Sequence, residues 1–133
     1  MKRNRRLLLK TAERIETIPE SYDQNEWAAR SRKSPCGTVA CLAGEIIICS
    51  ERRVEDGIKK LFMALEDQGQ HGFVDDVAGD LAGFDYSEIY DLFYEAGTWP
   101  EPFLSRYYKA KTQRGRANAA AALLRYLADG GEV

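Results

Sequence analysis

Two of the chain's three cysteines lie five residues apart in the segment "SPCGTVACLAGE", residues 34–45. Side chains of this type and spacing could form a metal clip, a redox pair or a reactive thiol, or could be packed as small apolar groups. A structural zinc site usually takes four ligands in two closely spaced pairs. Here the pair Cys36 and Cys41 would need Cys49 and the single histidine, His71, at irregular spacing. We therefore expect no metal site.

Redox and nucleophilic chemistry place different demands on the same segment. Thioredoxin-like chemistry uses C-x-x-C at a helix start after a strand, and the C-x4-C spacing does not fit it. A reactive thiol is the better alternative, because Cys36 would precede a predicted helix whose free amides and dipole lower a thiol pKa. A base is lacking nearby, since His71 is distant and Glu45 is the sole charged residue between Val39 and Cys49. The candidate thiol and helix-start site comprises Cys36, Gly37, Thr38 and Cys41.

Packing is the interpretation that the segment favours. Free cysteines are among the most buried residue types and pack as small hydrophobes. Thr38 is a suitable N-cap for an apolar helix, and Ala40 and Gly44 would let another segment approach that helix closely. We predict a central apolar helix at about 38–50. No catalytic residue and no cofactor is predicted, and a non-enzymatic protein is favoured over an enzyme.

The elements around this helix are also predicted to be helical. Apolar spacing and end signals predict helices at 3–17, 54–67, 74–81, 86–96, 103–111 and 112–128, with a loop at 19–37. No segment alternates clearly between apolar and polar residues, although "EIIICSERRV" has the β-branched content of a buried strand. The length of 133 residues suits one core. The predicted fold is an all-α, compact, single-domain bundle of six or seven short helices over residues 1–133.

Charge is distributed unevenly along the chain. Residues 1–33 carry a net charge of +4, residues 34–102 of −10, and residues 103–133 of +4. The ends can fold back on the middle, subunits can pair head to tail, or a basic face can meet an external anion. A nucleic-acid-associated accessory protein is therefore one alternative function. Its candidate contacts are Lys2, Arg3, Arg5, Arg6, Arg30, Arg32, Lys33, Arg114, Arg116 and Arg125.

Apolar runs and the number of cysteines limit the cellular compartments in which the protein is expected. No apolar run approaches the roughly 20 residues that span a bilayer, and the N-terminal apolar stretch Leu7–Leu9 is too short for a secretory signal. An odd number of cysteines fits a reducing compartment. We expect a soluble, cytoplasmic protein without a membrane partner.

Nine of the fourteen aromatic residues lie in segment 84–108. Tyr86, Tyr90 and Tyr94 recur every four residues and so form one stripe of a helix. The stripe is either a half-buried seam, which is favoured, or an exposed patch. The leading functional hypothesis is a non-enzymatic module for protein–protein contact or self-association through this segment. Its candidate partner surface is Tyr86, Tyr90, Tyr94 and Trp99; the alternative is a thiol-dependent or ligand-binding protein centred on Cys36.

The segment "CGTVACLAG" resembles the C-G-T-x-A-C-x-A-G signature of a group of small bacterial and phage proteins. The resemblance extends to "LLLKTAERIE", "SYDQNEWA", "YDLFYEAGTWP", "FLSRYY" and "ANAAAALLRYLADGG", which together span most of the chain. It implies no activity, since none is assigned to that group. It does imply a shared role for Cys36, Gly37, Thr38, Ala40, Cys41 and Gly44. Glu45 departs from the pattern, where a bulky residue such as tryptophan is expected, which weakens Glu45 as a catalytic group.

Overall fold

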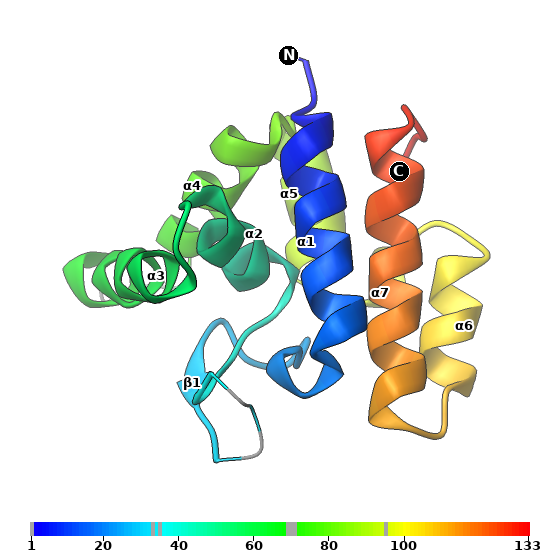
Figure 1. Cartoon of the computed structure of the whole chain (residues 1–133). Coiled ribbons are helices and arrows are strands. Elements are labelled where there is room, and N and C mark those ends of the chain that lie inside the picture. Colours follow the sequence, from blue (N-terminus) through cyan, green and yellow to red (C-terminus); the bar gives the residue numbers. More distant parts are fainter. Residues whose placement is uncertain (1, 33, 35, 69–71, 95) are drawn as a thin grey trace.

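The computed structural model describes residues 2–32, 34, 36–68, 72–94 and 96–133. The described residues form seven α-helices, two short strands and two 3-10 turns, so the predicted all-α bundle is confirmed (Figure 1). The elements are α1 (Arg5–Thr17), η1 (Pro19–Ser21), β1 (Ala29–Arg30), β2 (Thr38–Val39), α2 (Leu42–Ser50), α3 (Val54–Gln68), α4 (Gly72–Ala82), α5 (Tyr86–Phe93), η2 (Ala96–Thr98), α6 (Phe103–Lys109) and α7 (Gln113–Ala128). Among the described residues, no helix combines the length and apolar character needed to cross a bilayer.

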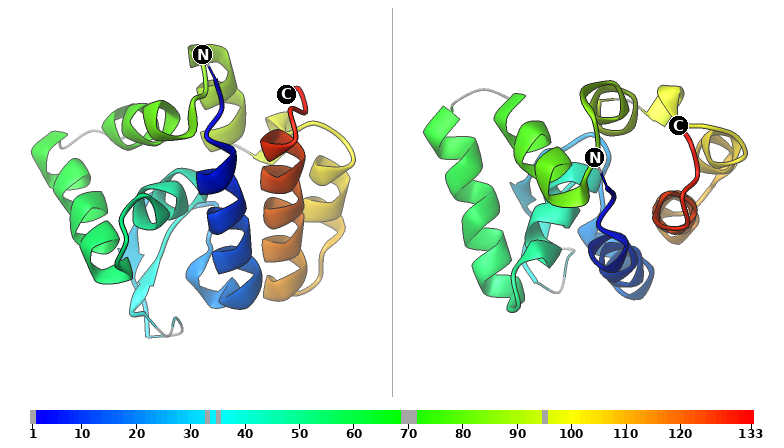
Figure 2. Two further views of the ribbon diagram at one scale, coloured as in Figure 1. Left: turned by 45° about the horizontal axis from the view of Figure 1, so that its top comes forward. Right: turned by 90° about the horizontal axis from the view of Figure 1, so that it is seen from above.

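Helices α1 and α7 lie side by side and antiparallel, with α6 against the other flank of α7 (Figure 1). The two chain ends therefore meet at one end of the molecule (Figure 2). The buried side of α7 includes Ala117, Ala120 and Ala121, all 0% exposed. These small side chains allow neighbouring helices, α1 among them, to approach α7 closely.

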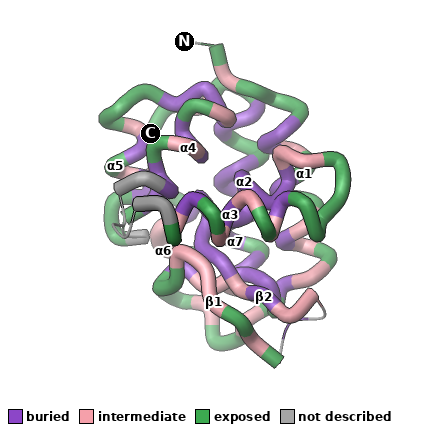
Figure 3. The backbone as a smooth tube through the Cα atoms, turned by 90° about the vertical axis from the view of Figure 1, so that its left-hand side faces the viewer, coloured by how far each residue is buried: buried purple, intermediate pink, exposed green. Residues whose placement is uncertain are grey.

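Helix α2 is the centre of the core. All of its residues from Leu42 to Cys49 are buried (Figure 3), and α1, α3, α4 and α5 pack around it. A helix that is apolar on every side belongs inside a protein. Glu45 is the only charged residue of α2, and its side chain is fully buried.

The segment before α2 differs from its prediction. Thr38 and Val39 form strand β2, which pairs antiparallel with Ala29 and Arg30 of β1. Helix α2 therefore begins at Leu42, and its N-cap is Cys41 rather than Thr38. The reason is a tight turn at Gly37, whose φ of +77° suits glycine and directs the chain back along β1.

The basic ends are held in two ways. Arg3 forms an ion pair with Glu88 of the acidic middle, as expected if an end folds back on it. Arg125 of α7 instead pairs with Glu16 of α1, so the two basic ends also bind each other. These contacts use two of the cations considered for nucleic-acid binding, which stays an untested hypothesis.

Candidate functional site

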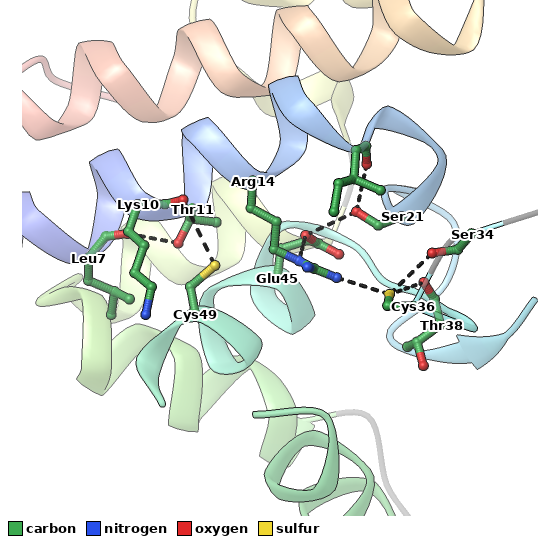
Figure 4. A network of polar contacts seen from close by, with 11 residues as sticks. Leu7, Lys10, Thr11, Arg14, Ser21, Ser34, Cys36, Thr38, Glu45 and Cys49 are labelled. Atoms are coloured by element: carbon green, nitrogen blue, oxygen red, sulfur yellow. Dashed lines mark hydrogen bonds and ion pairs between the residues drawn. The ribbon is translucent and has the colours of Figure 1, made fainter. Parts of the chain in front are cut away.

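The side chain of Arg14 connects three segments of the fold. It extends from α1 towards the start of β2 and the first turn of α2 (Figure 4). Its Nε donates to Oε2 of Glu45 at 2.9 Å, and its Nη2 donates to Sγ of Cys36 at 3.2 Å. The Arg14 side chain is 8% exposed. One buried guanidinium thus serves two acidic groups.

Glu45 is incompletely satisfied. Ser21 Oγ can donate to Oε2 of Glu45 at 3.4 Å, but the carbonyl oxygen of Ile18 competes for the same proton at 2.8 Å. The other oxygen, Oε1, is buried and has no hydrogen-bond partner among the residues that the structure describes. Burial raises the pKa of Glu45 to about 7, although Arg14 and Ser21 oppose the shift. This carboxyl group therefore changes its charge near neutral pH.

Cys36 is the most accessible of the three thiols, and its side chain is half-buried. Its sulfur lies 3.2 Å from Ser34 Oγ and 3.5 Å from the carbonyl oxygen of Thr38. Burial raises the pKa of the Cys36 thiol, but the hydrogen bonds with Ser34 and Arg14, together with the charge of Arg14, outweigh burial and lower it. The sulfur is thus both accessible and next to a cation.

The predicted reason for a reactive Cys36 was wrong. Cys36 lies in the turn before β2, five residues ahead of the N-cap of α2, so the helix dipole does not act on it as proposed. Gly37 forms the turn, and Thr38 supplies a carbonyl oxygen rather than a capping hydroxyl. The cation that lowers the thiol pKa comes from α1, 22 residues away in sequence.

The other two thiols are placed differently. Cys36, Cys41 and Cys49 are all free. Cys41 and Cys49 are 2% and 5% exposed. Burial raises the pKa of Cys41 to about 12 and that of Cys49 to about 11. For these two residues the packing interpretation fits.

The structure also bears on the metal hypothesis. Among the described residues, no three His, Cys, Asp or Glu side chains gather in a way that could hold a metal ion. His71, the only possible nitrogen ligand in the zinc hypothesis, lies outside the described residues.

The tyrosine stripe is on the surface. Tyr86, Tyr90 and Tyr94 are 80%, 58% and 42% exposed, and we call these three residues the tyrosine face. The rings of Tyr90 and Tyr94 are 5.4 Å apart, and Trp27 meets Tyr94 edge-on at 5.6 Å. Trp99 does not belong to this surface. It is 3% exposed, and its Nε1 donates to the carbonyl of Leu92 at 3.1 Å, so its place in the predicted partner surface was wrong.

A hollow of about 460 Å³ lies beside the tyrosine face and shares Tyr94 with it. Its walls include apolar and polar groups and, among the described residues, one carboxylate but no cation. Those lining residues are Gln24, Asn25, Glu26, Trp27, Cys41, Phe93 and Tyr94. The Tyr94 hydroxyl donates to the carboxylate of Asp75, which fixes the ring at the rim.

Helix α5, which carries the tyrosine face with Tyr94 as its C-cap, and the preceding helix α4 are acidic. Residues 75–94 hold six Asp and Glu residues and no Lys, Arg or His. Only Glu88 of these six forms an ion pair within the described part of the chain. The remaining carboxylates, of Asp75, Asp76, Asp80, Asp85 and Asp91, have no cationic neighbour within ion-pair distance there.

Cys36 and Glu45 stand out in the sequence, whereas Arg14 was not predicted to belong to the site. A signal was present, because Leu7, Thr11 and Arg14 are spaced by four and three residues and so share one face of α1. Leu7 and Thr11 are buried. A charged residue on a buried helical face indicates a partner, and Glu45 was the one charge in the apolar helix.

No protein-family model, no curated protein and no solved structure matches the chain. Function therefore has to be argued from the geometry of the chain itself.

Proposed function

We propose that the protein is a non-enzymatic binding module that takes a basic segment of a partner protein on the tyrosine face and in the adjoining hollow. The observation that carries the proposal is the exposed stripe of Tyr86, Tyr90 and Tyr94 along α5, where Asp85 and Asp91 have no ion-pair partner among the described residues. It refines the sequence-based hypothesis by replacing Trp99 with the hollow.

The aromatic groups suit a cationic side chain. Guanidinium and ammonium groups bind over the faces of Tyr and Trp, with energies of about 0.5–2 kcal/mol per contact. Tyr94 is fixed by Asp75 and by its ring contacts, so little conformational freedom is lost there on binding. An arginine of the partner placed against Tyr90 and Tyr94 would also lie close to carboxylates.

The charge distribution supports the same partner. Asp76, Asp80 and Asp85 are exposed and have no ion-pair partner among the described residues. Such carboxylates attract a basic segment and repel an acidic one, which contributes selectivity and a faster association rate. Tyrosine and arginine are also the residues most often found at energetically important interface positions.

The test is fluorescence anisotropy with a labelled peptide of alternating arginine and glycine, and with a second peptide in which glutamate replaces arginine. The arginine peptide should bind and the glutamate peptide should not. The affinity should fall when salt rises from about 50 to about 300 mM, because the contacts are largely exposed charges.

The decisive variant is Tyr90→Ala, which should weaken binding of the arginine peptide about five-fold through the lost cation–aromatic contact. Tyr108→Ala is the matched control, because Tyr108 is 63% exposed but lies on α6. Equal affinities for these two variants would contradict the proposal. A second copy of this chain could present its own basic ends, and a concentration-dependent mass in ultracentrifugation that Tyr90→Ala abolishes would identify that partner.

A further inference from the structure

The contacts of Arg14 define a second site, independent of the tyrosine face. The guanidinium lies between a fully buried carboxylate and a half-buried thiol (Figure 4). Enclosing charged groups in a core is costly. The apolar helix α2 nevertheless carries Glu45 at its centre, and the only cation within ion-pair distance of Glu45 in the described chain also contacts Cys36.

We propose that Cys36 is a site of oxidation by peroxides, that Arg14 positions its thiolate, and that Glu45 controls its reactivity by competing for the same guanidinium. Arg14 and Glu45 are positioning residues, and the sulfur of Cys36 is the reacting atom.

The hydrogen bonds around Cys36 favour the thiolate over the thiol. Arg14 can only donate, and Ser34 Oγ can donate, so two donors at 3.2 Å face the sulfur. The thiol form could donate to the Thr38 carbonyl oxygen at 3.5 Å or to Ser34 Oγ, but a neutral sulfur is only a weak acceptor for Arg14, which can do nothing but donate. The lowered pKa of Cys36 agrees with this arrangement.

The reaction step is a two-electron oxidation. The thiolate sulfur attacks one peroxide oxygen, the S–O bond forms, and the O–O bond breaks. The departing hydroxide, or alkoxide from an organic peroxide, takes a proton from water, and Cys36 becomes a sulfenic acid. Sulfur is oxidised while the peroxide is reduced, so the peroxide is the only co-reactant.

The product should persist on Cys36. A second thiolate would convert the sulfenic acid to a disulfide. Cys41 and Cys49 are buried, and their pKa values of about 12 and about 11 leave them protonated near neutral pH. No internal thiol of this chain is therefore ready to resolve the oxidised Cys36.

Glu45 adds a pH-dependent control. When Glu45 is ionised, its negative charge partly neutralises the positive charge of Arg14 and repels the Cys36 thiolate, so the thiolate is less stabilised. When Glu45 is protonated, the full charge of Arg14 faces the sulfur. Its partnerless Oε1 can hold that proton without giving up the contact between Oε2 and Arg14.

Few other ionisable groups of the described chain face Arg14 and Glu45. Besides Arg14, the groups that act electrostatically with Glu45 are Cys41 and Cys49 at the two ends of α2, and Tyr22 in the loop after η1. Burial raises the pKa of Tyr22 well above its usual range, and the two thiols are neutral as well. Within the described chain, Cys36 and Glu45 are therefore the two groups beside Arg14 whose change of charge matters: the pKa of Glu45 is about 7, and that of Cys36 is lowered.

The experiment measures the rate at which each cysteine of the folded chain reacts, as a function of pH, by mass spectrometry. Iodoacetamide reports the thiolate, and hydrogen peroxide followed by dimedone reports the sulfenic acid. Cys36 should react at least ten-fold faster than Cys41 and Cys49, and should reach its half-maximal rate at a lower pH than in the urea-unfolded chain. Equal rates at all three cysteines, or no dimedone adduct on Cys36, would overturn the proposal.

Two variants distinguish control of Cys36 reactivity by the charge of Glu45 from a purely structural role of Glu45. Glu45→Gln keeps the acceptor for Arg14 but removes the competing charge, so the Cys36 midpoint should fall by about one pH unit and the rate near pH 7.5 should rise about three-fold. The double variant Arg14→Gln with Glu45→Gln removes both charges, so that neither is left buried without its partner. The pH midpoint of Cys36 reactivity should then rise, and the reaction rate of Cys36 near pH 7 should fall about ten-fold. If Glu45 only supported the conformation of the turn that carries Cys36, Glu45→Gln would change the reaction rate of Cys36 at every pH and leave its pH midpoint unchanged. An unmoved midpoint in Glu45→Gln rejects the control by Glu45, whether or not the double variant folds.

Discussion

The carboxyl group of Glu45 is fully buried at the centre of the core. The free-energy cost of desolvating this carboxylate is not fully offset. Within the described residues its Oε1 has no hydrogen-bond partner, and its Oε2 depends on Arg14. Replacing a buried charged pair by neutral groups of similar shape is often neutral or stabilising, whereas removing one partner strands the other. The sequence places this charge where a helix of pure packing would have none, which is why we assign it a function.

Stability should depend on pH through this residue. Burial raises the pKa of Glu45 from 4.5 for a free carboxyl to about 7 in the folded chain, so the folded state binds this proton more tightly than the unfolded state. Stability from this group is thus fully present at low pH and declines as pH rises through the interval between the two values. Relative to Glu45→Gln, the free energy of unfolding should fall by about 2 kcal/mol between about pH 5 and about pH 7.5.

Urea unfolding of both chains across this range measures the difference. The measurement is made in a Cys36→Ser background, so that the thiol does not titrate. A difference between the two chains that is constant with pH would show that Glu45 keeps an ordinary pKa in the folded state.

The residue scale also shows what the sequence could and could not predict. The sequence pointed to Cys36 as the candidate thiol, which is the most accessible of the three, and to Glu45 as the one charge in an apolar segment. Their connection could not be predicted, because it runs through Arg14, on a helix that packs beside them only in the folded chain. Exposure was likewise decided by packing, which placed Tyr90 on the surface and Trp99 in the core.

At the scale of elements, local signals predicted most helices well. The helices α5 and α7 begin after Asp85 and Thr112, whose side chains accept from backbone amides of the first turn. The start of α2 was missed, because the apolar run from Thr38 continues smoothly into the helix. Strand β2 is distinguished from helix α2 by its pairing with β1, which is a contact with residues outside this apolar run.

The close contact between α2 and α3 depends on Gly57. A Cβ atom at this position would lie 2.0 Å from the carbonyl oxygen of Ile48, which belongs to the backbone of α2. Alanine usually favours a helix over glycine by about 1 kcal/mol. Here Gly57→Ala should instead lower the free energy of unfolding by about 2 kcal/mol, because two helix backbones must move apart.

Gly97→Ala is the control for this prediction. The nearest atom to a Cβ there is the Tyr108 hydroxyl at 3.5 Å, so the change should stay within about 0.5 kcal/mol. Urea unfolding measures both variants. A Gly57→Ala chain as stable as the parent would mean that α2 and α3 can separate at no cost.

At the scale of the whole molecule, the two chain ends are fastened together by Arg3. Its Nη1 donates to the carbonyl of Leu127 at 2.9 Å and also to that of Gly131, while its Nη2 pairs with Glu88. The guanidinium therefore binds carbonyl groups at the C-terminal end of α7, where the helix dipole favours a cation. It joins the segment before α1, the first turn of α5 and the end of α7.

Arg3→Ala should therefore lower the free energy of unfolding by about 2 kcal/mol, since it removes charge-assisted hydrogen bonds from a partly buried site. Arg5→Ala is the matched control: Arg5 pairs with Asp129 at the same end of the molecule, but its side chain is 63% exposed, so the loss should stay below about 0.5 kcal/mol. Urea unfolding compares the two variants, and hydrogen exchange at the amides of 124–128 reports whether the end of α7 opens first. If Arg3→Ala matched Arg5→Ala in both measurements, the packing of α1 on α7 alone would hold the ends together.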